Sequence, residues 1–188
     1  MNFLTLSFII ISYSLSAQFQ HLIVERVSKD KKIGSTYRIY AELKNEGDQL
    51  LVVFGDKDHP LNISCDKVFY QDTESGATAY QSLSSRKNNA FVKDSWITIS
   101  SEKDNHPELQ FMGMNCKDFE TTGSAISSGQ DGAWYILPTS KMSVCGPEKR
   151  VLIAQLTTKG NISGILNLMG KTQQGDTWIE HGITLRNK

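Results

Sequence analysis

The stretch Ser35–Leu43 reads Ser-Thr-Tyr-Arg-Ile-Tyr-Ala-Glu-Leu, and it decides the fold class. Apolar side chains recur at every second position from Tyr37 to Leu43, while the charged residues Arg38 and Glu42 occupy positions in between. Successive side chains of a β-strand point to opposite faces, so a period of two is typical of a strand with one buried face. The stretch therefore predicts a half-buried strand.

Segments of the same kind recur along most of the chain. Most are rich in Val, Ile, Thr and aromatic residues and are bounded by Gly, Pro, Asn or Asp. They are Gln20–Val27, Gln49–Phe54, Leu61–Cys65, Ser95–Ser100, Leu109–Met112, Ala133–Leu137, Val151–Thr158, Ile162–Met169 and Thr177–Leu185. About ten short strands with no helix predict an all-β fold, a single antiparallel β-sandwich or jelly roll.

The connections between these strands are of two kinds. Lys159-Gly160-Asn161 is a short connector in which glycine can adopt a positive φ, so Val151–Thr158 and Ile162–Met169 are predicted to form a hairpin. With the last strand they would make a three-stranded meander. Gln71–Asn89 and Gly113–Gly132 are polar, with few apolar anchors, and are predicted to be long loops.

Composition excludes some classes of protein. The chain has 188 residues, of which 39% are hydrophobic, and its 20 Lys and Arg balance its 20 Asp and Glu. A nucleic-acid-binding protein usually carries a basic excess that neutralises phosphates, so no nucleic acid partner is expected. The ordinary apolar content and zero net charge argue against disorder. The length suits one domain.

The N-terminal segment predicts export. An apolar run from Phe3 to Leu15 is followed by Ser16-Ala17, which is typical of a secretory signal peptide cleaved after Ala17. The run departs from that pattern in having no Lys or Arg before it. A membrane anchor is the alternative, but the run is shorter than the roughly 20 residues that span a bilayer. We expect a signal peptide at 1–17, a β-sandwich at 18–188, a secreted or cell-surface location and no membrane span in the mature chain.

The chain has three cysteines, Cys65, Cys116 and Cys145. In an oxidising compartment an odd number leaves at least one thiol unpaired within the chain. A Cys116–Cys145 disulfide is the favoured pairing, because it would close a long polar stretch of the C-terminal half. The alternative is three buried thiols that pack as small hydrophobic residues.

Catalytic motifs are absent from the sequence. It has no His-Glu-x-x-His, no Gly-x-Ser-x-Gly, no phosphate-binding or dinucleotide-binding glycine pattern and no Cys-x-x-Cys. Its four histidines are dispersed, and no two lie at metal-ligand spacing. No catalytic residue is predicted, and a non-enzymatic role is favoured.

The turn Phe54–Pro60 holds the densest group of polar residues. Asp56 and Asp58 lie two positions apart beside Gly55, so they could supply oxygen ligands to a calcium ion. Lys57 lies between them and would oppose a cation. The alternative is a solvated turn in which the Asp side chains bind backbone amides.

Tryptophans are the second group of candidate ligand-binding residues. Trp96 alternates with Ile97, and Trp178 alternates with Ile179, so each indole is placed on the face opposite an isoleucine. If the isoleucines face the core, Trp96 and Trp178 are partly exposed and could stack on sugar rings of a polysaccharide. The alternative is that both indoles are buried, as large aromatic side chains usually are.

Several segments together resemble a known kind of module. The sequence is similar, over most of Val24 to Thr184, to an uncharacterised secreted β-sandwich module of marine and Bacteroidetes-type bacterial surface proteins. The segments that carry the resemblance are Gly34–Leu43, Val53–Asp56 with His59–Leu61, Asp94–Ile99, Gly132–Tyr135 with Pro138, Val151–Thr158 and Ser163-Gly164. The resemblance implies export and a sandwich fold, and it implies no activity, ligand or catalytic residue.

These observations favour a secreted or cell-surface binding or adhesion module without catalytic activity, directed at an extracellular polysaccharide or another surface protein. Two alternatives remain open. One is an extracellular hydrolase whose site is assembled from scattered carboxylates and histidines. The other is a structural subunit that assembles through an exposed strand edge.

Overall fold

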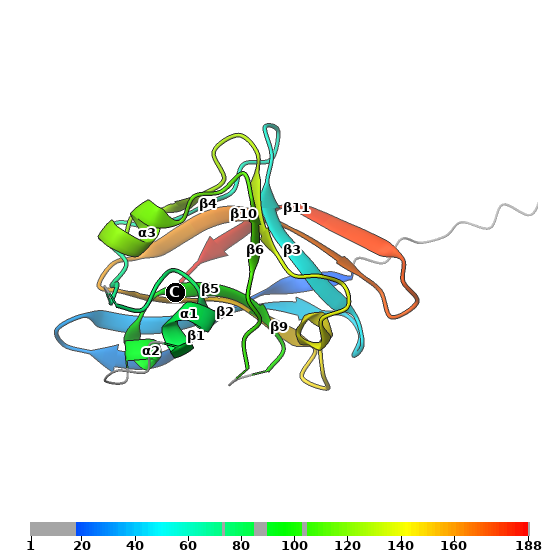
Figure 1. Ribbon diagram of the computed structural model, residues 1–188, viewed down its shortest axis with the longest axis horizontal. Helices are drawn as coiled ribbons and strands as arrows, with labels where there is room; N and C mark the ends of the chain where they lie inside the picture. The colour runs from blue at the N-terminus through cyan, green and yellow to red at the C-terminus, as the bar shows by residue number, and fades with distance from the viewer. Residues whose placement is uncertain (1–17, 73, 85–89, 103–104, 188) are drawn as a thin grey trace, which may run out of the picture.

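The computed structural model describes residues 18–72, 74–84, 90–102 and 105–187. The segment 1–17, with its predicted signal peptide, lies outside the described residues. Two antiparallel sheets face each other in a β-sandwich, which confirms the predicted fold class (Figure 1). Within the described part of the chain, no helix combines the length and apolar character needed to cross a membrane.

The smaller sheet has four strands and the larger sheet has seven. The smaller sheet runs in the order β1 (Phe19–Asp30), β2 (Gly34–Leu43), β9 (Arg150–Thr158) and β5 (Trp96–Ser100). The larger runs in the order β6 (Gln110–Met112), β8 (Gly132–Tyr135), β3 (Gln49–Gly55), β10 (Ile162–Lys171), β4 (Asn62–Cys65) and β7 (Ile126–Ser127), with β11 (Thr177–Arg186) paired to β10. Each of the predicted strand segments overlaps one of these strands, and the two-residue β7 was not predicted.

The two polar stretches predicted as loops contain short helices. They are α1 (Ala79–Ser84) and α3 (Lys117–Thr122). A further short helix, α2 (Ala90–Lys93), begins directly after the first stretch, and a 3₁₀ turn, η1 (Lys141–Ser143), follows later in the chain. None exceeds six residues. A helix this short cannot display the repeated apolar spacing by which a longer helix is recognised in a sequence. The expectation of no helix was therefore wrong.

The predicted hairpin between β9 and β10 was also wrong. Both edges of β9 are occupied, by β2 on one side and β5 on the other, so no edge is left for β10. The connector at Gly160 instead carries the chain from the smaller sheet to the larger one. Asp66 fixes the crossing, because its carboxylate accepts hydrogen bonds from the backbone N–H and the side-chain amide of Asn161 at 2.8 and 3.0 Å. The pairing of β10 with β11 was predicted correctly.

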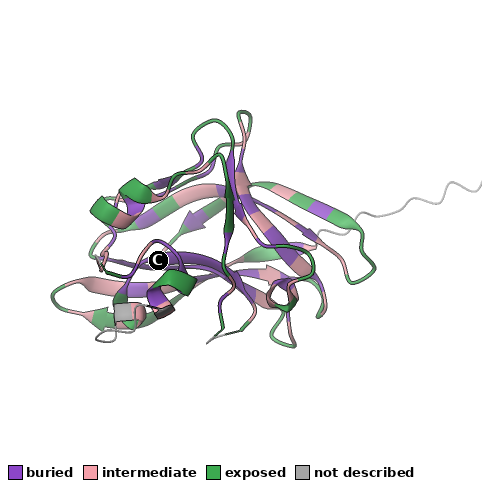
Figure 2. Cartoon of the chain, viewed as in Figure 1, coloured by how far each residue is buried: buried purple, intermediate pink, exposed green. Residues whose placement is uncertain are grey.

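One hydrophobic core fills the space between the sheets. It combines residues of both, including Ile39 and Ile153 from the smaller sheet and Val53, Trp134 and Leu166 from the larger, all fully buried. Figure 2 shows this burial along the facing strands and the exposure of the connecting loops. Because the sheets share these contacts, we expect them to unfold together.

The expectation that Trp96 and Trp178 are partly exposed was wrong, since their exposed fractions are 0% and 9%. Trp96 lies on the outer face of the smaller sheet, but Ala79 of α1 and Phe91 of α2 cover it, and the Phe91 ring stacks on the indole at 4.9 Å. Trp178 faces the core because Gly170, its partner on β10, leaves room for the indole.

The predicted Cys116–Cys145 disulfide is not formed, and Cys65, Cys116 and Cys145 are free thiols. Cys145 is buried beside the β2–β3 turn, where its thiol donates to the backbone carbonyl of Asn45 at 2.9 Å. Cys116 directly precedes α3 and lines a different region of the surface, together with Ala77, Gln81 and Glu120. Burial raises the pKa of the Cys116 thiol to about 11 and also raises the pKa of Cys145, so neither is a ready nucleophile.

Candidate metal centre

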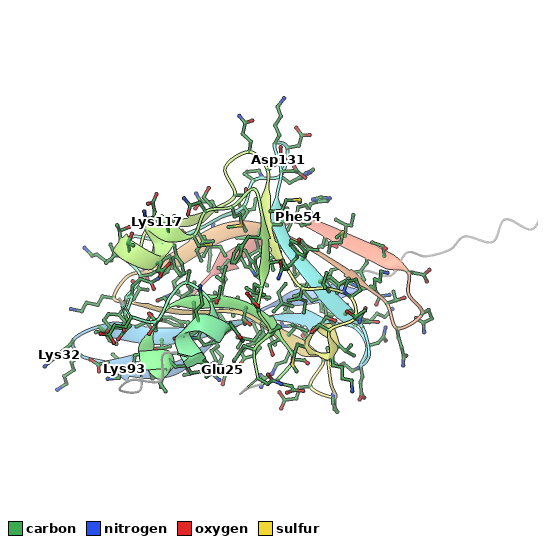
Figure 3. All side chains as sticks on the ribbon, in the orientation of Figure 1. Glu25, Lys32, Phe54, Lys93, Lys117 and Asp131 are labelled. Carbon is green, nitrogen blue, oxygen red and sulfur yellow. The ribbon has the colours of Figure 1, made fainter. Side chains whose placement is uncertain are left out.

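The turn between β3 and β4 is organised by Asp56. Its Oδ1 accepts hydrogen bonds from the backbone N–H groups of Asp58 at 2.9 Å and His59 at 2.7 Å, as Asp side chains commonly do in turns. The His59 N–H bond is the main cause of an Asp56 pKa below its usual value, so this carboxylate is charged at neutral pH. Phe54, labelled in Figure 3, lies at the end of β3 that leads into the turn.

A β-bulge in β11 brings His181 to the same place. The pairing of β10 with β11 shifts between Leu166 and Leu168, so that two residues, His181 and Gly182, lie opposite Asn167. Gly182 has a φ of +66°, a left-handed conformation that glycine adopts without steric cost. The bulge thus changes the direction of the His181 side chain relative to a regular strand.

The buried amide of Asn167 joins the turn to the bulge. Its Nδ2 donates to the backbone carbonyls of Phe54 at 2.9 Å and His59 at 2.7 Å, and its Oδ1 accepts from the N–H of Gly182 at 2.9 Å. Asn167 is fully buried, and all these contacts are to backbone atoms. One side chain therefore fixes the relative position of the two segments that carry the histidines.

Asp56, His59 and His181 converge on one point. Each offers one possible ligand atom, and these atoms all lie within 4.8 Å of one another. The His59 and His181 rings are stacked with centroids 4.1 Å apart, and the His59 Nδ1 lies 3.1 Å from Asp56 Oδ1. The edge of the Phe54 ring packs against His181, with centroids 5.5 Å apart.

The centre lies at the surface, open to an ion from solvent. The Asp56 and His59 side chains are 37% and 43% exposed, and His181 is an exposed residue. In a tetrahedral zinc site the ligand atoms lie about 2.0–2.2 Å from the metal, so they are about 3.4 Å apart. The possible ligand atoms lie within 4.8 Å of one another, so binding an ion requires the stacked imidazoles of these partly exposed side chains to rotate toward it.

The donor set fits a zinc-class ion. Two imidazole nitrogens and one carboxylate oxygen suit Zn²⁺, Ni²⁺ or Cu²⁺, whereas calcium takes six to eight oxygen ligands. Three protein ligands leave a fourth position open. The donors at this turn therefore differ from the oxygen-only set on which the calcium prediction was based.

Of the sequence-predicted site residues, only Asp56 belongs to this centre. Asp58 contributes its backbone N–H to the turn, and its side chain is not part of the converging group. His59 and His181 were not predicted as metal ligands, and histidines entered only the hydrolase alternative. The Asp56-x-x-His59 spacing within one turn is a local signal that could have identified His59. His181 has no such signal, because only strand pairing brings it to the turn.

Comparison with known proteins yields no relative. No family model, no curated protein and no solved structure matches this chain. The resemblance to a module of bacterial surface proteins therefore stays a prediction. The geometry of the described residues is the basis for the function proposed below.

Proposed function

We propose that the protein is an exported, non-catalytic binding module whose site is a zinc-class metal centre formed by Asp56, His59 and His181. The observation that carries the proposal is the convergence of these three side chains from a turn and a distant strand. Support comes from Asn167, a buried residue whose three hydrogen bonds hold the two segments together. These bonds reach the backbone of the two segments, so Asn167 fixes the positions from which His59 and His181 extend.

The open coordination position gives the ion a role in binding. An ion held at the surface by three protein ligands accepts a fourth donor from a second molecule. A carboxylate on an extracellular polysaccharide, or a side chain of another surface protein, supplies a donor of this kind. The metal would thus connect the module to its partner.

One observation favours a second candidate function, a metal-dependent hydrolase. The same open position could hold a water molecule, and a zinc ion lowers the pKa of bound water enough to make it a nucleophile at neutral pH. The exposure of all three ligands argues for binding instead, because catalytic sites usually enclose most of a small substrate in a concave pocket.

Calorimetric titration of the metal-free protein with ZnCl₂ tests the proposal. We expect one site per chain, and we expect His59→Gln and His181→Gln each to weaken zinc binding at least tenfold, because each removes one of three ligands. CaCl₂ should give no comparable binding, since calcium prefers oxygen donors.

His21→Gln is the matched control. His21 lies on β1 of the smaller sheet, where its Nδ1 is 3.0 Å from a carboxylate oxygen of Glu42, and its removal should leave zinc affinity unchanged. Zinc binding that survives both His59→Gln and His181→Gln would overturn the proposed site. Zinc-dependent ester hydrolysis that both variants abolish would favour the hydrolase.

A further inference from the structure

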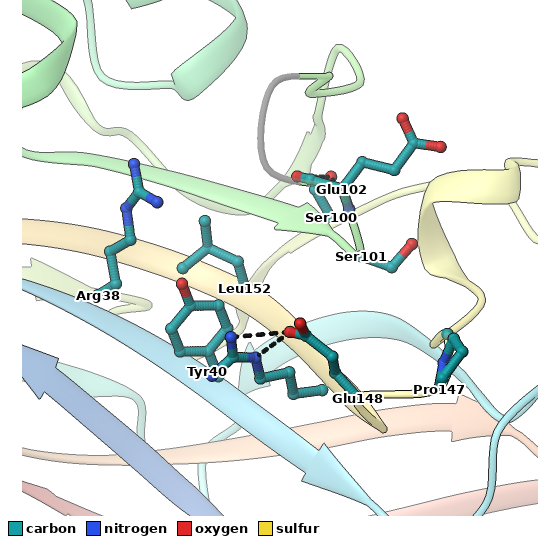
Figure 4. Close-up of a pocket in the computed structure, with 10 residues that line it drawn as sticks. Arg38, Tyr40, Ser100, Ser101, Glu102, Pro147, Glu148 and Leu152 are labelled. Atoms are coloured by element: carbon teal, nitrogen blue, oxygen red, sulfur yellow. Dashed lines mark hydrogen bonds and ion pairs between the residues drawn. The ribbon is translucent and has the colours of Figure 1, made fainter.

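A pocket on the outer face of the smaller sheet is separate from the metal centre. Its volume is about 240 Å³, and it lies between β2, β9, the end of β5 and the turn that precedes β9 (Figure 4). Arg38, Tyr40, Ser101, Arg150 and Leu152 are among the residues that line it. The metal ligands belong to the larger sheet and its β3–β4 turn.

One wall of the pocket is formed by Arg150, whose positive charge is neutralised by neighbouring carboxylates. Arg150 binds the Glu148 carboxylate through Nε and Nη2, both at 2.8 Å, and its Nη1 lies 3.8 Å from Glu25. The same guanidinium lies over the Tyr40 ring, 4.6 Å from the centroid. Arg150 is thus engaged with protein groups and is not the cation that would attract a ligand.

Arg38 has a different environment. Its Nε donates to Gln155 Oε1 at 3.2 Å, and no carboxylate among the described residues forms an ion pair with it. Gln155 is fully buried, and its Nε2 donates to the backbone carbonyls of Phe91 and Asp94, each at 2.9 Å. A buried amide therefore holds the Nε of the guanidinium, and its two terminal nitrogens make no hydrogen bond to a described residue.

Other residues of the lining could bind the hydroxyl groups and the apolar face of a ligand whose carboxylate binds Arg38. The Tyr40 and Ser101 hydroxyls line it without a side-chain hydrogen bond to another described residue, and Leu152 supplies an apolar surface. Glu102 lies at the rim, and in Figure 4 its side chain extends away from Arg38. Arg38 is therefore the lining cation that forms no ion pair with a described residue, and Glu25 lies opposite it in the β1–β2 register.

We propose that this pocket binds the carboxylate of a small ligand, either a single sugar-acid ring or a small organic acid, with Arg38 as its anchor. A guanidinium presents two parallel N–H donors that match the two oxygens of a carboxylate. The volume is below the roughly 300–1,000 Å³ of sites for drug-sized ligands, so the pocket suits a molecule of about one ring. This site is independent of the proposed metal centre.

Titration of ¹⁵N-labelled protein tests the proposal, with the Arg38 Nε–H signal as the reporter. D-glucuronate represents a sugar acid, succinate an organic acid, and D-glucose the neutral control. We expect at least one of the two acids to shift the Arg38 signal saturably and to bind at least tenfold more tightly than glucose. The stronger of the two identifies the source of the carboxylate.

Three variants separate anchoring from a general charge effect. Arg38→Met should weaken binding of the acid at least tenfold, and Arg38→Lys should also weaken it, because lysine keeps the charge but lacks the paired donors. Lys31→Gln removes one positive charge from the exposed β1–β2 turn and should leave binding unchanged. Equal binding of glucose, no saturable shift with either acid, or full binding by Arg38→Met would overturn the proposal.

Discussion

Asp94 is a buried carboxylate in the short connection between α2 and β5. Its Oδ1 accepts from the N–H of Asp72 at 2.8 Å, and its Oδ2 accepts from the Ser82 hydroxyl at 3.3 Å. Burial, the largest influence, raises the pKa of Asp94 to about 7 from 3.8, because the charged form is poorly solvated. The folded chain therefore holds this proton more tightly than the unfolded chain, and the stability it contributes below pH 3.8 is lost as the pH rises through 7.

Asp94→Asn should remove this part of the pH dependence. We expect the stability of the variant relative to the wild type to increase between pH 4 and pH 8 by on the order of 4 kcal/mol, since asparagine keeps an acceptor and cannot ionise. Urea unfolding at pH 4.5, 6 and 8 measures the difference. Parallel stability profiles for the two proteins would show that Asp94 does not titrate in this way.

Two buried amides, Asn167 and Gln155, position the groups at both sites. Neither was singled out from the sequence, because a polar residue in an alternating strand pattern is usually assigned to the exposed face. Asp56 was recognised because carboxylates in a turn are a familiar metal-binding pattern. Charged and aromatic residues can thus be proposed as site residues from the sequence, whereas the role of a buried amide is known only from the backbone atoms that it binds in the structure.

At the scale of elements, the β11 bulge and the β3–β4 turn form one unit through Asn167. Asn167→Leu has nearly the same volume but leaves the Phe54 carbonyl and the Gly182 N–H without their partner, at about 1–3 kcal/mol for each buried group. We expect a loss of about 3 kcal/mol in the free energy of unfolding. Zinc affinity, measured by calorimetry, should fall at least tenfold because the two histidines lose their common support.

Leu168→Ala separates this effect from general destabilisation. Leu168 is the next residue of β10, is fully buried in the core, and should cost about 2–5 kcal/mol when truncated. It touches none of the hydrogen bonds at the turn, so zinc affinity should stay near that of the wild type. Equal loss of zinc binding in both variants would mean that Asn167 has no particular role in the metal centre.

The elements also show where sequence patterns succeed. The alternation in Ser35–Leu43 and its counterparts located the strands because a half-buried strand needs one apolar face. Strand pairing was harder to predict, since pairing depends on which edges are free. β9 has both edges filled, so the short connector at Gly160 changes sheets and forms no hairpin. The assignment of faces in β11 was wrong because Gly170 accommodates the Trp178 indole on the core side.

For the whole molecule, the shared core predicts a single unfolding transition that zinc shifts upward. Zinc at one hundred times its Kd adds about 2.7 kcal/mol to the free energy of unfolding if only the folded chain binds it. For a chain of this length the midpoint should rise by about 5–10 °C. Differential scanning calorimetry measures both features, and His181→Gln should remove the shift. Two separate transitions would contradict a core common to both sheets.

Global properties of the sequence set limits on function without locating a site. The charge balance of 20 basic and 20 acidic residues argued against nucleic acid, but it did not identify Arg38 as a cation without an ion pair among the described residues. His59 and His181 meet only because β10 pairs with both β3 and β11. Contacts between residues so far apart in the chain are a property of the folded molecule.

The central claim is that Asp56, His59 and His181 bind a zinc-class ion. The most direct test is diffraction from crystals grown with ZnCl₂, with data collected on both sides of the zinc absorption edge. We expect an anomalous peak about 2.0–2.2 Å from one nitrogen of His59, one nitrogen of His181 and one oxygen of Asp56. A peak located only at other residues, or no peak from crystals in which this surface is free of neighbouring molecules, would contradict the claim.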